Sequence, residues 1–78
     1  MPRLPNDLSG REVRVALERA GFVFRRQRGS HMILRRDEPA ARVTIPNHKV
    51  IRIGTLRHIL NEAGLGVAEF LTLLGRES

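Results

Sequence analysis

Residues 22–46 read FVFRRQRGSHMILRRDEPAARVTIP, and this stretch decides the fold. It contains three short runs with the composition of β-strands: Phe22–Arg28, His31–Arg36 and Arg42–Pro46. Gly29-Ser30 separates the first two runs, and the turn-forming residues 37–40 separate the second run from the third. Because connections this short join antiparallel neighbours, we predict a three-stranded antiparallel sheet.

Apolar residues with the spacing of amphipathic helices lie on both sides of this stretch. Before it, Ser9 is placed to cap a first helix, and Glu12 completes a capping box with it. After it, a second helix is predicted to open at Thr55 and to close at Gly64, and a third follows. The apolar stripes are Val13, Ala16, Leu17 and Ala20; Leu56, Ile59, Leu60 and Ala63; and Val67, Phe70, Leu71 and Leu74.

These segments give the order α-β-β-β-α-α within a single domain over residues 1–78. Antiparallel sheets commonly pack one face against the core and expose the other to solvent. We therefore predict an α+β sandwich, with the helices on one face of the three-stranded sheet.

The register of the first two strands decides which side chains share a face, because a slip of one residue exchanges the faces. A two-residue turn at Gly29-Ser30 brings the aromatic Phe24 opposite the charged Arg35. A three-residue loop pairs Phe24 with Leu34 instead, and it leaves Arg26 at the edge of the helix-facing side. We therefore predict the three-residue loop. In this register the open face carries Arg25, Gln27, His31, Ile33 and Arg35.

The charge of the chain is strongly biased toward arginine. Fourteen basic residues stand against eight acidic ones, a formal net charge of +6, and Lys49 is the only lysine. Because the planar guanidinium group suits phosphate, this balance favours a nucleic-acid partner over a membrane.

Cysteine is absent, which excludes disulfides and thiolate chemistry. No apolar run is long enough for a signal peptide or a membrane span, so we expect a cytoplasmic protein.

Few residues are candidates for catalysis. The acidic residues are scattered, and His31, His48 and His58 lack the short spacing of metal ligands, so we expect no metal and no cofactor. His31 is the leading candidate for general acid/base chemistry, because it follows a tight turn and imidazole titrates at roughly pH 6.5. The arginines around it in the sequence are Arg25, Arg26, Arg28, Arg35 and Arg36.

Other readings of these residues stay open. His48 follows the third strand, where it is a second acid/base, a phosphate contact or a loop histidine that satisfies backbone groups. An alternative role for the arginines is to protect the edges of the sheet from aggregation. Tyrosine and tryptophan are absent and the three phenylalanines fit core positions, so base stacking is not expected. Recognition of RNA through phosphates, shape and ribose hydroxyls suits this composition better.

Four segments resemble, in order and spacing, the HicA-type mRNA interferase toxins. They are LERAGF (17–22), RQRGSH (26–31), VTIPNH (43–48) and GTLRHIL (54–60). The resemblance extends over about residues 9–74. It implies a fold like that of double-stranded-RNA-binding domains, and a toxin that cleaves mRNA and is held inactive by a HicB-type antitoxin.

The resemblance also assigns roles to residues. The catalytic histidine of the family follows a Gly-Ser pair, a position that is His31 here. The Pro-x-His feature of the family falls on Pro46 and His48, and no catalytic role is transferred to His48. The residues expected to bind RNA are Arg25, Arg26, Arg28, Gly29, Ser30, Arg35 and His48.

We therefore expect the toxin of a type II toxin–antitoxin system, a metal-independent endoribonuclease that uses His31 as general acid/base. In this mechanism His31 takes the proton of a ribose 2′-OH, which then attacks the adjacent phosphate. The first alternative is a non-catalytic RNA-binding module of the same fold. The second is an adaptor whose basic face binds an acidic protein.

Overall fold

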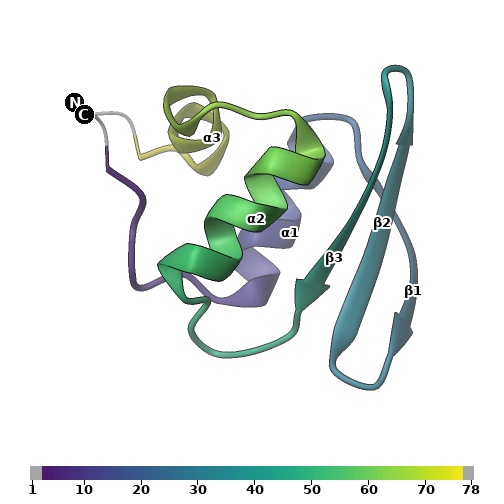
Figure 1. Cartoon of the computed structure of the whole chain (residues 1–78), viewed down its shortest axis with the longest axis horizontal. Helices are drawn as coiled ribbons and strands as arrows, with labels where there is room; N and C mark the ends of the chain where they lie inside the picture. Colours follow the sequence, from purple (N-terminus) through teal and green to yellow (C-terminus); the bar gives the residue numbers. More distant parts are fainter. Residues whose placement is uncertain (1–2, 77–78) are drawn as a thin grey trace.

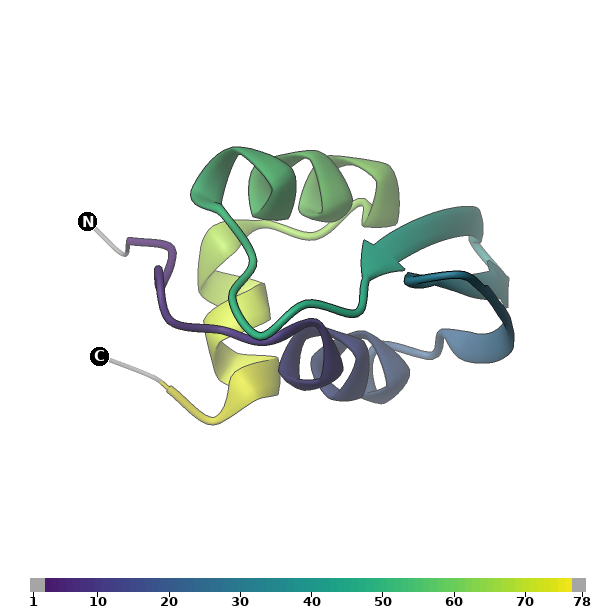
Figure 2. The same cartoon turned by 90° about the horizontal axis from the view of Figure 1, so that it is seen from below.

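The computed structural model describes residues 3–76 and confirms the predicted order of elements (Figure 1). The three strands form one antiparallel sheet in the order β1-β2-β3. The first two helices lie across one face of this sheet, and within the described residues no helix covers the other face (Figure 2). The elements are α1 (Gly10–Arg19), β1 (Val23–Arg28), β2 (His31–Asp37), β3 (Ala40–Pro46), α2 (Ile53–Ala63) and α3 (Val67–Leu74).

The third helix forms a further layer, because α3 packs on α1 on the side away from the sheet (Figure 2). All helices therefore lie on the same side of the sheet, as an α+β sandwich requires. Within the described residues, no helix combines the length and the apolar character needed to cross a membrane.

Local signals set the ends of the helices. The capping box of α1 is present: the Ser9 hydroxyl accepts from Glu12 N–H at 3.1 Å, and the Glu12 carboxylate accepts from Ser9 N–H at 3.0 Å. Gly64 ends α2 in the left-handed conformation, as predicted. The predicted start of α2 at Thr55 is wrong, because the helix begins at Ile53. Its N-cap is Arg52, which directly follows the buried Ile51.

The predicted register of the first hairpin is wrong next to the turn. Arg28 pairs with His31, so the turn has only the two residues Gly29-Ser30. Gly29 adopts φ +57°, the positive value that two-residue hairpin turns require. Further along, a β-bulge between Phe24 and Arg26 restores the predicted pairing of Phe24 with Leu34. The extra residue is therefore absorbed inside β1 rather than in the loop.

This bulge changes the faces of two side chains. Gln27 pairs with the buried Met32 and so lies on the helix-facing side, not on the open face as predicted. Arg26 pairs with Ile33 and lies on the open face, not at the edge of the helix-facing side. The second hairpin is also tighter than predicted, because β2 and β3 pair as far as Asp37 and Ala40.

The core between sheet and helices is apolar. Each of the three helices contributes fully buried side chains, among them Leu17, Leu56 and Phe70, and the sheet contributes Met32 and Leu34. No buried polar or charged residue occurs in the described part of the chain. The tight packing of this layer fixes the sheet against the helices and leaves its other face free.

Arg36 links the sheet to both helices that cover it. Its guanidinium group donates to the carbonyls of Ala20 at 3.4 Å and Ala63 at 3.1 Å, at the C-terminal ends of α1 and α2. It also donates to the carbonyl of Pro39 at 2.9 Å and lies 4.5 Å from the centre of the Phe22 ring. A cation is favourable at the negative end of a helix, so this arginine stabilises the fold.

Candidate nucleic-acid interface

Arginine side chains from all three strands gather on the open face of the sheet. Arg25 and Arg26 from β1, Arg35 from β2 and Arg42 from β3 line a hollow of about 740 Å³. Ile33 lies at the same hollow and is only 7% exposed, although none of the helices of residues 3–76 covers this face. We attribute this burial to the aliphatic parts of the arginines, which commonly lie along apolar surface. The open face is therefore basic, with an apolar residue beneath the charges.

The bulge explains why two consecutive arginines serve one face. In a regular strand neighbouring side chains point to opposite faces, so Arg25 and Arg26 would be separated. At a bulge, two residues of one strand oppose one residue of its partner, which here is Ile33. Both arginines consequently line the same hollow.

His31 lies at the end of this open face. It is the first residue of β2, and the register places it between Arg28 of β1 and Pro46 of β3. Residues directly opposite in antiparallel strands share a face, and alternation along β2 puts His31 on the same face as Ile33. The His31 side chain is exposed, and within residues 3–76 its ring has no hydrogen-bond partner. The imidazole is thus exposed on a residue that lies directly opposite Arg28.

The turn before His31 is held by two hydrogen bonds and has open space around Gly29. The Gln27 side-chain amide donates to the carbonyl of Gly29 at 2.9 Å. The carbonyl of Ser30 accepts from the backbone N–H of Asn47 at 2.6 Å, which ties the turn to the loop after β3. A side chain at Gly29 would meet no heavy atom within 4 Å, so the space around this position is open.

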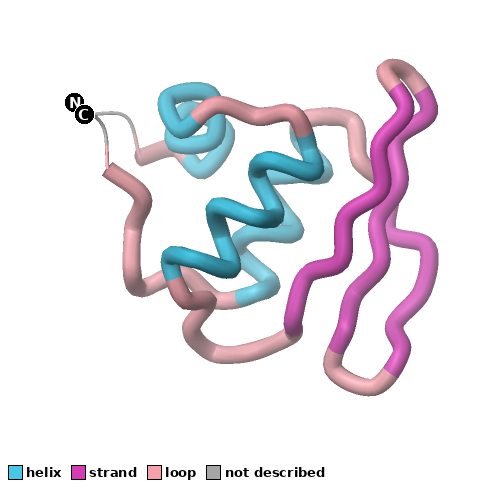
Figure 3. The backbone as a smooth tube through the Cα atoms, in the orientation of Figure 1, coloured by secondary structure: helices cyan, strands magenta, loops and turns pink. Residues whose placement is uncertain are grey.

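His48 lies on that same loop, one residue beyond Asn47. Its carbonyl accepts from the backbone N–H of Gly10 at 2.9 Å, so the start of α1 also holds the loop. A Cβ at Gly10 would collide with the carbonyl oxygen of Pro46, which explains the glycine at this position. The His48 side chain is exposed. The loop and the β1–β2 turn occupy the same end of the sheet (Figure 3).

The structure therefore brings the predicted site residues into two adjoining groups. Arg25, Arg26 and Arg35 share the hollow of the open face, whereas Arg28, Gly29, Ser30, His31 and His48 lie at its end. Arg36 also lines the hollow, but its guanidinium group already donates to the backbone carbonyls of Pro39, Ala20 and Ala63.

One basic residue of the open face was missed in the sequence. Arg42 lies directly opposite Arg35 in the β2–β3 register. The alternation of β3 contained the signal, because Val43 and Ile45 are buried and the residues between them face outward. Residues 3–76 bring no three His, Asp or Glu side chains close enough together to hold a metal ion.

Fold and surface define a small α+β domain whose open sheet face is basic and ends in an exposed histidine. Residues 10–65 match the family model described as the HicA toxin of bacterial toxin–antitoxin systems. The match covers most of the chain, which therefore belongs to the HicA toxin family. Such a toxin has an antitoxin as its partner, and α3 lies beyond the matched residues. Among curated proteins, a sequence comparison finds no match.

Proposed function

We propose that this HicA-family protein is an endoribonuclease that cleaves mRNA with His31 as its general base. The observation that carries the proposal is the position of His31. Its imidazole is exposed at the start of β2, opposite Arg28 and at the end of the arginine-lined face. A proton acceptor beside groups that bind phosphate is the arrangement that RNA cleavage requires.

In the proposed reaction, neutral His31 takes the proton of a ribose 2′-OH. The 2′-oxygen bonds to the adjacent phosphorus, and the bond from phosphorus to the 5′-oxygen breaks. The leaving oxygen takes a proton from water or from His48, whose loop is held at the same end of the sheet. The products are a 2′,3′-cyclic phosphate and a 5′-hydroxyl. Arg28 stabilises the negative charge that develops on the phosphate.

The open face supports binding of the RNA backbone. Arg25, Arg26 and Arg35 offer guanidinium groups to phosphates, and the free space at Gly29 allows the strand to approach the turn. Ser30 and His48 complete the binding surface beside His31. The substrate is mRNA in the cytoplasm. The partner that keeps the enzyme inactive is a HicB-type antitoxin. The reaction as proposed needs no metal ion and no cofactor.

The test measures RNA cleavage by the purified protein in the presence of EDTA. Wild type is expected to cut RNA to cyclic-phosphate ends, and His31→Ala is expected to lose cleavage while it retains RNA binding. His58→Ala is the matched control, because His58 is an exposed histidine on α2 that lies 3.5 Å from Glu62. This variant is expected to cut as wild type does. A single-stranded DNA of the same sequence lacks the 2′-OH and should remain intact.

Three results would contradict the proposal. Cleavage by His31→Ala at the wild-type rate would remove His31 from the chemistry, and cleavage of DNA would remove the 2′-OH mechanism. If neither protein cuts but both bind RNA with a strong dependence on salt, the chain is a non-catalytic RNA-binding module.

A further inference from the structure

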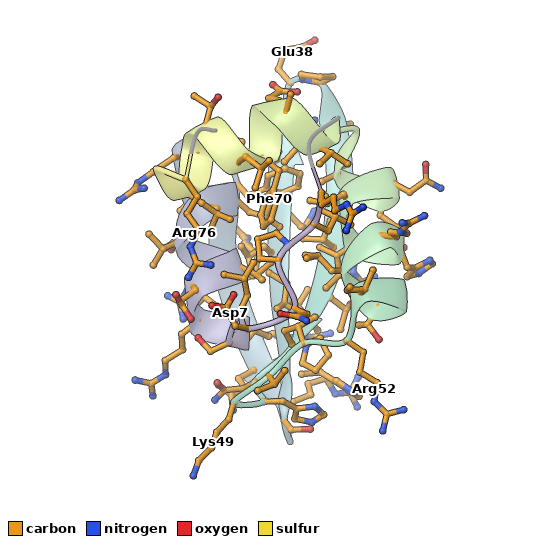
Figure 4. The ribbon with its side chains drawn as sticks, turned by 90° about the vertical axis from the view of Figure 1, so that its left-hand side faces the viewer. Asp7, Glu38, Lys49, Arg52, Phe70 and Arg76 are labelled. Atoms are coloured by element: carbon orange, nitrogen blue, oxygen red, sulfur yellow. The ribbon has the colours of Figure 1, made fainter. Side chains whose placement is uncertain are left out.

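The middle of the sequence is strongly basic. Ten of the fourteen basic residues lie within residues 19–61, and the only acidic residues in that range are Asp37 and Glu38. Asp37 is the last residue of β2, and Glu38 lies in the β2–β3 turn that follows it. Glu38 lies at one end of the molecule, whereas Lys49 and Arg52 lie at the opposite end (Figure 4).

Lys49 and Arg52 share that end with the histidine turn. The β1–β2 turn and the loop over residues 47–52 both lie at the lower end in Figure 1. Both basic side chains are exposed, and within residues 3–76 neither has an ion-pair partner or a side-chain hydrogen bond. Two free cations therefore extend the basic surface around the end of the sheet, from β1 toward α2.

The loop that carries Lys49 is fixed on both sides of it. Before Lys49, the carbonyl of His48 accepts from Gly10 N–H at 2.9 Å. After it, Ile51 is buried, and its N–H donates to the carbonyl of Leu8 at 2.7 Å. Arg52 follows directly as the N-cap of α2. Fixed backbone lowers the entropy cost of binding, because only the side chains remain to be ordered.

We infer that Lys49 and Arg52 bind phosphates of the same RNA that passes His31. The inference rests on the proposed function in so far as the ligand is RNA. The RNA backbone then crosses the arginine-lined face, passes the Gly29-Ser30 turn and continues to the loop before α2. Lys49 and Arg52 contact phosphate only and contribute affinity without sequence preference.

The experiment measures RNA binding in the His31→Ala protein, in which the RNA stays intact. A fluorescently labelled RNA hairpin is titrated over a series of KCl concentrations, with the Lys49→Ala/Arg52→Ala double change and with each single change. Removal of one side chain that binds phosphate lowers the slope of log K against log[KCl] by about 1. In the double variant, the magnitude of this slope is therefore expected to decrease by about 2, and RNA is expected to bind several-fold more weakly at low salt.

Arg3→Ala is the matched control for charge. Arg3 is exposed and belongs to the segment before α1, which begins on the side of the molecule away from the β1–β2 turn (Figure 1). This variant is expected to keep the parent slope. The exchanged pair Lys49→Arg/Arg52→Lys retains both charges and is expected to restore binding. Far-UV circular dichroism checks that every variant is folded.

Three outcomes would overturn the inference. These are an unchanged slope in the double variant, an equal loss in Arg3→Ala, and a parent that binds no RNA. If the double variant binds an acidic polypeptide more weakly but binds RNA as the parent does, this end of the molecule binds a protein partner instead. The proposed function fails separately: if wild type does not cleave RNA but the double variant loses slope, only the catalytic proposal is wrong. If wild type cleaves and the slope is unchanged, only the present inference is wrong.

Discussion

Arg35 and Arg36 are adjacent in the sequence, yet their guanidinium groups have different surroundings. Arg35 lines the open face, whereas Arg36 donates three hydrogen bonds to backbone carbonyls and is partly buried. Hydrogen bonds from a charged donor contribute more to stability than neutral ones, and their loss leaves carbonyls without partners. Two residues of one type thus have separate roles, one in the proposed binding and one in the fold.

We expect Arg36→Ala to lower the free energy of unfolding by about 2 kcal/mol or more. Arg35→Ala is its matched control and should change stability by less than about 0.5 kcal/mol, while it weakens RNA binding. Urea denaturation followed by circular dichroism measures the first effect, and titration with labelled RNA measures the second. Equal losses of stability in the two variants would show that the role assigned to Arg36 is wrong.

Gly10 is a second residue whose role is visible only in three dimensions. A methyl group there would collide with the carbonyl of Pro46, in a segment that the Gly10–His48 hydrogen bond holds in place. Gly10→Ala is therefore expected to cost about 1–3 kcal/mol of stability. It should also weaken RNA binding, because the loop with His48 and Lys49 must shift.

Gly54→Ala provides the comparison for Gly10→Ala. Gly54 lies in the first turn of α2, and a Cβ there would meet no atom within 4 Å. Alanine is the better helix former, so this change should raise stability by up to about 1 kcal/mol. Thermal unfolding of both variants measures the difference, and a stable Gly10→Ala protein would contradict the proposed collision.

At the scale of the elements, the bulge in β1 reconciles two demands on the first hairpin. The turn requires Arg28 opposite His31, and the core requires Phe24 opposite Leu34. One extra residue between these pairs satisfies both, and it also directs a second arginine to the open face.

Deletion of Arg25 is expected to remove the bulge without disturbing the other pairs of β1 and β2. The deleted chain keeps Phe24 opposite Leu34 and Arg28 opposite His31, so the hairpin becomes regular. We expect the deleted protein to unfold cooperatively, with stability within about 1 kcal/mol of wild type. Its RNA binding should lose about 1 from the salt slope.

Deletion of Ile33 provides the control, since β2 has no bulge there. Loss of one residue from a regular strand exchanges the faces of the residues on one side of the deletion. Either Met32 or Leu34 would leave the core, and this protein is not expected to fold. Thermal unfolding of the two deletion variants distinguishes the cases, and failure of both to fold would contradict the assigned function of the bulge.

At the scale of the whole molecule, the features that the sequence predicts correctly are those set by local patterns of residues. The helix stripes, the capping box at Ser9 and the order of strands follow local periods and local hydrogen bonds. The residues of the open face could be predicted in part, because the alternation of side chains along a strand placed Arg25 and Arg35 there. Arg42 could have been added by the same rule.

The remaining features depend on contacts between distant segments. The bulge arises because the turn and the core require different registers of the same two strands. No single segment of the sequence shows both requirements. The role of Arg36 depends on two helix ends that lie far from it in sequence. The loop with Lys49 acquires its place from Leu8 and Gly10, so its relation to His31 is a tertiary property.

The attachment of residues 8–10 to the loop after β3 has a consequence for synthesis of the chain. His31 and its turn are made in the first half of translation, whereas Arg52 is followed by the helix that buries Leu56 and Ile59. A nascent chain that ends before α2 lacks the core that holds the loop in position. The end of the sheet that we propose to bind RNA is therefore complete only once α2 has been made. On the proposed function, synthesis itself thus delays the moment at which the antitoxin is needed.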